Sequence, residues 1–248
     1  MSKAGKDRNK AKRVVEQQKA RERRRKVTIW TSVAVVFLLV AAGLVGYAVS
    51  SSQQAADAGK LVVPSAAVDD GSAFAVGSGP VVVDLYEDFM CPVCRVFESQ
   101  SSAALRDLAA KNEITLRYHP VAILDEASEG TQYSSRSAGA SAAAGQGGKF
   151  VEYHDALYAN QPEENTPGLT DDKLIELGRS VGLTDATFSD AVKNKTYVPW
   201  AGKNTETFSA RGYTGTPTVV VAGKKVTGPN NALPTTADVT KAIDAAKG

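Results

Sequence analysis

The stretch PVVVDLYEDFMCPVCRVFESQSSAALRDLAA, residues 80–110, decides the fold. Its first seven residues are nearly all apolar and rich in β-branched side chains, as in a strand that is buried on both faces. Residues 95–110 carry apolar side chains at helical spacing. Cys91 and Cys94, the only cysteines of the chain, lie between these two segments. The stretch therefore predicts a central strand, a closely spaced cysteine pair and a helix that follows directly.

The cysteine pair is expected to do chemistry rather than to stabilise the fold, because a disulfide across three residues closes almost no loop. Unpaired backbone N–H groups and the helix dipole at a helix start stabilise a thiolate at Cys91. Pro92 fits the first helical turn, where its missing N–H costs nothing. The spacing predicts thiol–disulfide exchange, in which Cys91 meets the partner thiol and Cys94 resolves the mixed disulfide.

A metal site is the main alternative use of a cysteine pair. Zinc takes four ligands, and the chain offers only two histidines, His119 and His154, at no usual zinc spacing. We therefore predict no metal and no organic cofactor.

An uncharged apolar run indicates a membrane segment near the N-terminus. Residues 27–49 contain 23 residues without a charge, and as a helix they reach roughly 34 Å, enough for a hydrocarbon core of about 30 Å. A cleavable signal peptide is the alternative, but its apolar part would be unusually long. We expect an uncleaved single-pass anchor.

The charge distribution orients this anchor. Residues 1–26 hold twelve basic and three acidic residues, a net charge of +9, whereas the rest of the chain has a net charge of −7. The positive-inside rule predicts that residues 1–26 form a cytoplasmic tail and that the remainder lies outside the cytoplasm. The basic tail has no interleaved aromatic residues, so we expect it to orient the anchor, and we predict no nucleic-acid partner.

The outer part divides into a linker, residues 50–72, and a domain, residues 73–248, with a helical insertion at about 132–200. Short apolar runs at 61–63 and 73–76 are weakly β-like. The pattern predicts an α/β arrangement of strand, helix, strand, helical block, hairpin and helix. Beyond the opening stretch, the expected elements are a strand at 114–118, helices at 132–146, 149–160, 171–181 and 185–193, a hairpin of 218–221 with 224–226, and a helix at 235–246.

FMCPVCRVF, residues 89–97, resembles the active-site stretch of the DsbA-like branch of the thioredoxin superfamily. GYTGTPT, residues 212–218, resembles the second signature of that branch, and YHDALYANQP, residues 153–162, resembles part of its helical insertion. The resemblance covers residues from about 73 to the C-terminus. It implies an α/β thioredoxin-like fold with a helical insertion, here preceded by one transmembrane helix. It also implies a cis peptide bond before Pro217, which would place the backbone of Thr216 beside the cysteines, where an extended substrate can pair with it.

Thioredoxin-like folds often keep a buried acid on the strand before the cysteines. Asp84 is the candidate for this proton-transfer role, although it stands one residue further from the first cysteine than in thioredoxin, and this shift can turn it to the other face. Glu87 and Asp88 look like solvated loop residues. His119 is expected to make a surface hydrogen bond, and His154 to pack within its helix.

The combined interpretation is a membrane-anchored, extracytoplasmic thiol–disulfide oxidoreductase that forms disulfides in exported proteins with free thiols. Structural disulfides persist outside the cytoplasm, which favours the oxidase direction. The resemblance implies that a quinone-linked membrane protein reoxidises the pair. The rival hypotheses are a membrane-anchored reductase or isomerase, a non-catalytic binding or chaperone module, and, more remotely, a relative of glutathione-using enzymes.

Overall fold

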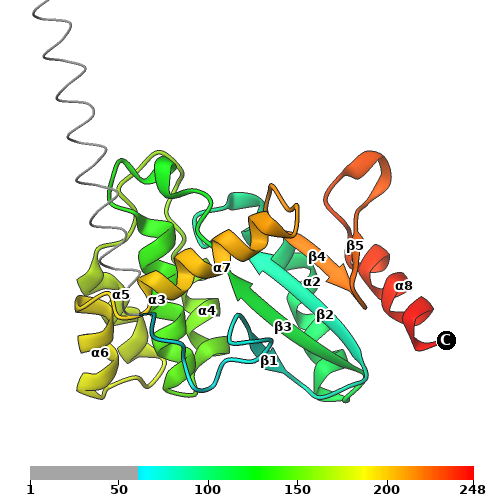
Figure 1. The fold of residues 1–248 in the computed structure, drawn as a ribbon, viewed down its shortest axis with the longest axis horizontal. Coiled ribbons are helices and arrows are strands. Elements are labelled where there is room, and N and C mark those ends of the chain that lie inside the picture. The colour runs from blue at the N-terminus through cyan, green and yellow to red at the C-terminus, as the bar shows by residue number, and fades with distance from the viewer. Residues whose placement is uncertain (1–60) are drawn as a thin grey trace, which may run out of the picture. The chain divides into compact units, whose positions relative to one another are not determined.

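The computed structural model describes residues 61–248, which form one compact unit (Figure 1). No helix in this part of the chain is both long and apolar enough to cross a membrane. The transmembrane helix predicted at 27–49 and the basic tail at 1–26 lie outside the described residues. The α/β class predicted from the sequence is confirmed for the described part.

In residues 61–248, five strands form one sheet in the order β1-β3-β2-β4-β5. The central strand β2 pairs in parallel with β3 and antiparallel with β4, while β1 and β5 are antiparallel edge strands. The parallel pair places the ends of β2 and β3 at the same edge, where the cysteine pair follows β2. The strands are β1 (Phe74–Val76), β2 (Val81–Glu87), β3 (Ile114–Pro120), β4 (Thr218–Val221) and β5 (Lys224–Val226).

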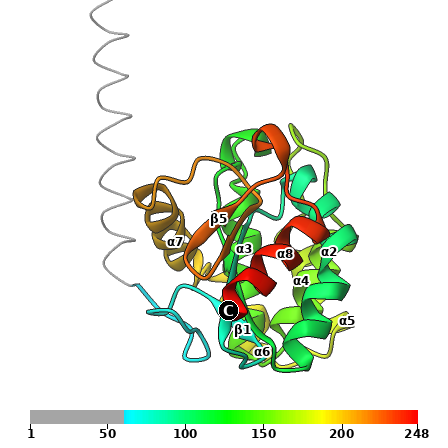
Figure 2. The same cartoon turned by 90° about the vertical axis from the view of Figure 1, so that its right-hand side faces the viewer.

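Helices cover both faces of the sheet. The helices α2 (Pro92–Ala110) and α8 (Thr236–Lys247) pack on one face, and α7 (Val198–Ala210) packs on the other, as Figure 2 shows. The remaining helices form the insertion between β3 and α7. They are η2 (Asp125–Ser128), α3 (Tyr133–Gln146), α4 (Phe150–Ala159), α5 (Asp171–Ser180) and α6 (Ala186–Lys193), and a short η3 (Pro229–Asn231) follows β5.

Every strand and helix expected between 80 and 193, the hairpin and the last helix are present within a few residues of their predicted bounds. The helix α7 was missed, although its buried Trp200, Ala201 and Phe208 have helical spacing. Its fourth buried residue, Asn204, interrupts the apolar pattern. The amide of Asn204 is satisfied by tertiary hydrogen bonds to the carbonyls of Ser72 and Pro120, which no local pattern reveals. The β-like interpretation of residues 61–63 was wrong, because these residues are exposed and form no strand.

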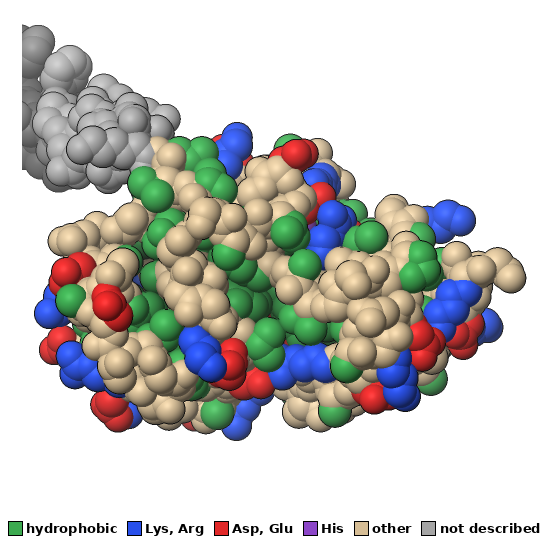
Figure 3. Space-filling view, turned by 90° about the horizontal axis from the view of Figure 1, so that it is seen from below, with side chains coloured by type: hydrophobic (Ala, Val, Ile, Leu, Met, Phe, Trp, Pro, Cys, Tyr) green, Lys and Arg blue, Asp and Glu red, His purple; other side chains and the backbone are tan. Residues whose placement is uncertain are grey.

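The surface carries charges of both signs. On the face drawn in Figure 3, hydrophobic side chains show between scattered basic and acidic ones, and neither sign forms a continuous field. This mixture is typical of a solvated protein surface.

Gly145 of α3 packs closely against the ring of Phe74 in the core, and the stability of a substituted chain tests this contact. A Cβ on Gly145 would lie 2.1 Å from the ring of Phe74, which is itself stacked on Phe150 at 4.5 Å. We expect Gly145→Ala to lower the free energy of unfolding by about 1–3 kcal/mol, because the aromatic stack must shift. Gly202→Ala in α7 is the matched control, since a Cβ there meets nothing within 4 Å, and higher helix propensity should leave it neutral or slightly stabilised. Denaturant unfolding of both variants checks this, and equal stabilities would contradict it.

Candidate active site

The cysteine pair lies where the sequence predicted, at the start of α2. Cys91 is the N-cap residue and Pro92 begins the helix. Both thiols are free, and Cys94 is fully buried while Cys91 keeps 5% of its surface exposed. A partner thiol can therefore approach only Cys91, which agrees with the predicted division of roles.

The loop before β4 faces the pair. The peptide bond between Thr216 and Pro217 is cis, as expected, and the Cys91 thiol donates a hydrogen bond to the Thr216 carbonyl at 3.4 Å. The fold thus brings Cys91 into contact with Thr216, which lies 125 positions further along the chain. The cis bond leaves backbone beside the reactive sulfur, where an extended peptide can pair with it.

The two thiols have opposite acidities. A hydrogen bond from Cys94 is the largest cause that lowers the pKa of Cys91, which falls to about 6. Thr216 and the backbone N–H groups at the helix start act in the same direction, and together these causes outweigh burial. Burial raises the pKa of Cys94 well above its usual value, and the charge of Glu87 adds to this effect. These acidities suit Cys91, rather than Cys94, to act as a nucleophile and as a leaving group.

The turn between β2 and α2 is fixed by a buried carboxylate. Asp88 accepts hydrogen bonds from the backbone of Met90 at 2.8 Å, from Ser134 of α3 at 2.7 Å and from the backbone of Leu124 at 3.0 Å. Burial raises the pKa of Asp88 to about 6 despite these bonds. The description of Asp88 as a solvated loop residue was wrong, and it instead ties the redox turn to the helical insertion.

Asp84 lies on the other face of the sheet from the α2 core. It accepts hydrogen bonds from Arg117 at 2.6 Å and from His119 at 2.9 Å, and both side chains come from neighbouring β3. Burial opposes ionisation, but these two partners lower the pKa of Asp84. His119 is 2% exposed, so its expected surface hydrogen bond is in fact a buried one. The structure pairs Asp84 with β3 and not with the thiols, and its proton-transfer role stays a prediction.

Glu87 is the last residue of β2, and its charge contributes to the raised pKa of Cys94. It is 3% exposed, so the description of it as a solvated loop residue was wrong. Its Oε2 lies 3.0 Å from Nε2 of His154, a residue that is buried as expected but also takes part in a polar cluster. Glu87 stands three positions after Asp84, and odd spacing on a strand places the two on opposite faces. This alternation is the sequence signal that could have identified Glu87, which the sequence analysis missed.

Two groups of side chains among the described residues could hold a metal ion by composition. One is Asp69, Asp84 and His119, of which Asp69 is only partly buried, and the other is the buried set Glu87, Glu98 and His154. In each group the ligand atoms lie within 4.8 Å of one another. Arg117 binds two acids of the first group, and Arg106 lies 3.7 Å from Glu98 of the second. The guanidinium groups already supply the positive charge that a metal would bring.

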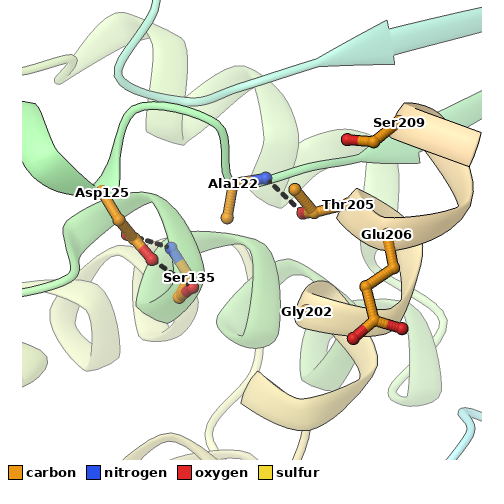
Figure 4. A pocket seen from close by; sticks show the side chains of 7 residues that line it. All are labelled: Ala122, Asp125, Ser135, Gly202, Thr205, Glu206 and Ser209. Carbon is orange, nitrogen blue, oxygen red and sulfur yellow. Dashed lines mark hydrogen bonds between the residues drawn. The ribbon is translucent and has the colours of Figure 1, made fainter. Parts of the chain in front are cut away.

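A surface hollow of about 490 Å³ lies among the turn after β3, α3 and α7 (Figure 4). Some of its polar groups already have partners: Asp125 accepts hydrogen bonds from Ser135, and Thr205 accepts one from the backbone of Ala122. None of its lining residues belongs to the cysteine pair or to the cis-proline loop.

A dithiol at a helix start, opposite a cis-proline on a mixed sheet, defines a thioredoxin-type thiol–disulfide oxidoreductase site. The chain belongs to the thioredoxin family, whose model matches residues 75–245.

The solved structures most similar to the chain include reduced DsbA from Mycobacterium tuberculosis, with 28% identity, a TM-score of 0.61, and coverage of 72% of this chain and 93% of that one. The disulfide bond oxidoreductase DsbG from the same organism matches with 28% identity, a TM-score of 0.61, and coverage of 72% and 88%. The serine/threonine-protein kinase PknE of M. tuberculosis is 31% identical over 140 residues, which are 54% of this chain and 24% of the kinase. The match thus spans about a quarter of that kinase.

The acidity of Cys91 can be tested by removing its largest stabilising contact. In the full chain we expect the alkylation rate of Cys91 to follow a titration with a midpoint of about 6. Cys94→Ala removes the hydrogen-bond donor, so the midpoint should move toward the value of about 8.5 for a free cysteine. The pH dependence of iodoacetamide labelling measures both. An unchanged midpoint in Cys94→Ala would show that the helix start and Thr216 suffice.

Proposed function

We propose that this protein oxidises pairs of thiols in exported proteins, outside the cytoplasm. The observation that carries this proposal is the opposite acidity of the two thiols, with the pKa of Cys91 lowered to about 6 and that of Cys94 raised. A thiol with a lowered pKa stabilises the reduced form of the pair. A stabilised reduced form makes the disulfide a stronger oxidant.

The reaction proceeds in two exchanges. A substrate thiolate attacks Sγ of Cys91 in the oxidised pair, forming a mixed disulfide while Cys94 departs and takes up a proton. A second substrate thiolate then attacks the substrate sulfur of the mixed disulfide, and Cys91 leaves as a thiolate. The substrate loses two electrons and gains a disulfide, and the cysteine pair gains the two electrons.

The cis-proline loop holds the substrate in this scheme. An extended peptide pairs with the backbone beside Thr216, which brings its cysteine to the one accessible sulfur, that of Cys91. Val93 and Val96 of α2 are about half exposed next to this point, and they offer apolar surface to the residues that flank the substrate cysteine.

The cellular setting is proposed from the sequence. The uncharged run at 27–49, with a basic flank on its N-terminal side, supports a single-pass anchor with the catalytic domain outside the cytoplasm. A membrane protein that passes electrons to quinone would return the pair to the disulfide, as the family resemblance implies.

The equilibrium reduction potential of the full chain tests the direction of exchange. We expect a value well above that of thioredoxin, about −270 mV, because the Cys91 thiolate stabilises the reduced form. Equilibration in glutathione buffers, with the reduced fraction counted by alkylation, gives the value. A potential close to that of thioredoxin would indicate a reductase.

Cys91→Ser separates catalysis from binding. This variant should lose all oxidation of a dithiol peptide, since no accessible sulfur remains to form the mixed disulfide. Full retention of activity in cells by Cys91→Ser would favour a binding or chaperone module instead. Lys225→Ala, an exposed position on β5, serves as a surface control and should behave as the unaltered chain.

A further inference from the structure

The turn between β2 and α2 is bound by a side chain from the end of α4. Nε2 of Gln161 donates hydrogen bonds to two main-chain carbonyls of this turn, that of Phe89 at 3.1 Å and that of Cys91 at 2.9 Å. One amide from the helical insertion therefore binds the redox turn on both sides of Met90. The two exchange steps of the reaction do not themselves require this contact, so its presence calls for an explanation.

The orientation of the Gln161 amide is fixed by its partners. Both partners are carbonyl oxygens, which only accept hydrogen bonds, so the NH2 group and not the amide oxygen must face the turn. The two N–H donors of the amide serve one carbonyl each. A glutamate at this position would place a carboxylate against two carbonyls, so the contact requires an amide.

The start of α2 lacks the side-chain cap that usually fixes a helix N-terminus. An N-cap residue commonly has a short polar side chain that accepts a hydrogen bond from the second or third N–H of its helix. Cys91 is the N-cap residue of α2, and its side chain makes no such bond. The backbone N–H groups of Val93 and Cys94 help instead to lower the pKa of the Cys91 thiol. The conformation of this N-cap therefore has to be held from outside the helix.

Gln161 holds the N-cap at its carbonyl. The carbonyl of Cys91 accepts the first hydrogen bond of the helix, from the backbone N–H of Arg95 at 3.3 Å. Gln161 binds the same oxygen at 2.9 Å, and a carbonyl oxygen with two lone pairs can accept both bonds. The direction of this carbonyl follows the ψ angle of Cys91, which is 114°. The amide thus fixes the peptide plane next to the reactive sulfur in one orientation.

The backbone around Gln161 is itself well held. Helix α4 ends at Ala159, and the backbone N–H of Gln161 bonds to the carbonyl of Tyr158 at 3.4 Å. Pro162 follows directly and restricts the backbone of Gln161 from the other side. The hydroxyl of Tyr158 donates to the carbonyl of Asp88 at 3.3 Å. Two side chains at the end of α4 therefore bind three carbonyls of the redox turn.

We propose that Gln161 is a positioning residue for thiol–disulfide exchange, which holds the main chain of Cys91 so that its sulfur stays between the helix start and the cis-proline loop. The observed arrangement places the Cys91 thiol 3.4 Å from the carbonyl of Thr216. Without the amide, rotation about ψ of Cys91 carries the sulfur away from the helix N–H groups and from Thr216. This inference rests on the thiol exchange proposed above.

The amide also favours the thiolate electrostatically. The carbonyl of Cys91 belongs to the same residue as the sulfur, so its partial negative charge opposes a negative charge on that sulfur. An N–H dipole bound to the carbonyl oxygen offsets part of this repulsion, and it does so more strongly in a partly buried site than in water. Gln161 therefore connects the helical insertion to the acidity of Cys91 and, through it, to the oxidising strength of the pair.

Gln161→Met tests this role, because it keeps the length of the side chain and removes both donors. In the full chain we expect the midpoint of Cys91 alkylation by iodoacetamide to move to higher pH. The kcat for oxidation of a dithiol peptide should fall about tenfold while KM changes less than about twofold. The reduction potential, measured in glutathione buffers, should become more negative. A side chain that served stability alone would lower the denaturant midpoint and leave the pH midpoint and the potential in place.

Asn160→Ala is the matched control. Asn160 is the neighbouring amide and also donates to a main-chain carbonyl, that of Ala156 at 2.9 Å, but this carbonyl belongs to α4 and not to the redox turn. The control should leave the alkylation midpoint, kcat and the potential unchanged. Tyr158→Phe removes only the hydroxyl that binds the turn, so it tests the same contact region if Gln161→Met does not fold. Its shifts should have the same direction and be smaller, since its hydrogen bond is longer.

The outcomes separate the role of Gln161 from the proposed function. A pH midpoint and a potential unmoved in Gln161→Met would overturn the positioning role, as would equal shifts in Asn160→Ala. If Gln161→Met does not fold, an unmoved midpoint in Tyr158→Phe would overturn it. If the unaltered chain fails to oxidise the dithiol peptide, the proposed function is wrong, and the alkylation midpoints still decide whether Gln161 positions Cys91.

Discussion

The structure depends on the contact between the start of α2 and the cis-proline loop. Cys91 is at once the N-cap of the helix, the residue after a buried strand, and the hydrogen-bond partner of Thr216. A thiolate there meets backbone N–H groups along one direction and the cis-proline loop along another. The sheet order with β2 between β3 and β4 is what brings these two segments, far apart in sequence, to the same edge.

Burial divides the roles of the two sulfurs. The same low-dielectric surroundings that make a charge on Cys94 costly make its S–H a good donor to Cys91, so the acidity of one thiol and the inertness of the other have one cause. Neither Pro92 nor Val93, the two residues between the cysteines, carries a charge, and the pKa of Cys91 still falls to about 6. The hydrogen bond from Cys94 supplies the largest part of the stabilisation, and backbone N–H groups at the helix start add to it.

Periodicity predicted most of the fold because that signal is local. The run before Cys91 and the hairpin of β4 and β5 each depend on a few neighbouring residues. The helix α7 escaped prediction because Asn204 occupies a core position whose hydrogen-bond partners lie more than eighty residues away. Glu87 and Asp88 escaped for a related reason: their partners come from the helical insertion, and without these partners the two acids look like solvated residues.

The central strand explains why the acids could not be assigned by distance along the chain. Side chains on β2 alternate between faces, so Asp84 and Glu87 belong to different environments, and each has a histidine and an arginine nearby on its own side. The register of β2 against β3 sets Asp84 opposite Arg117 and Tyr86 opposite His119. Both hydrogen-bond partners of Asp84 therefore lie on the neighbouring strand. Glu87 lies opposite Pro120 of β3, which offers no polar side chain. Its histidine partner, His154, therefore comes from α4. The helical insertion therefore supplies the histidine that pairs with Glu87 at the end of the central strand.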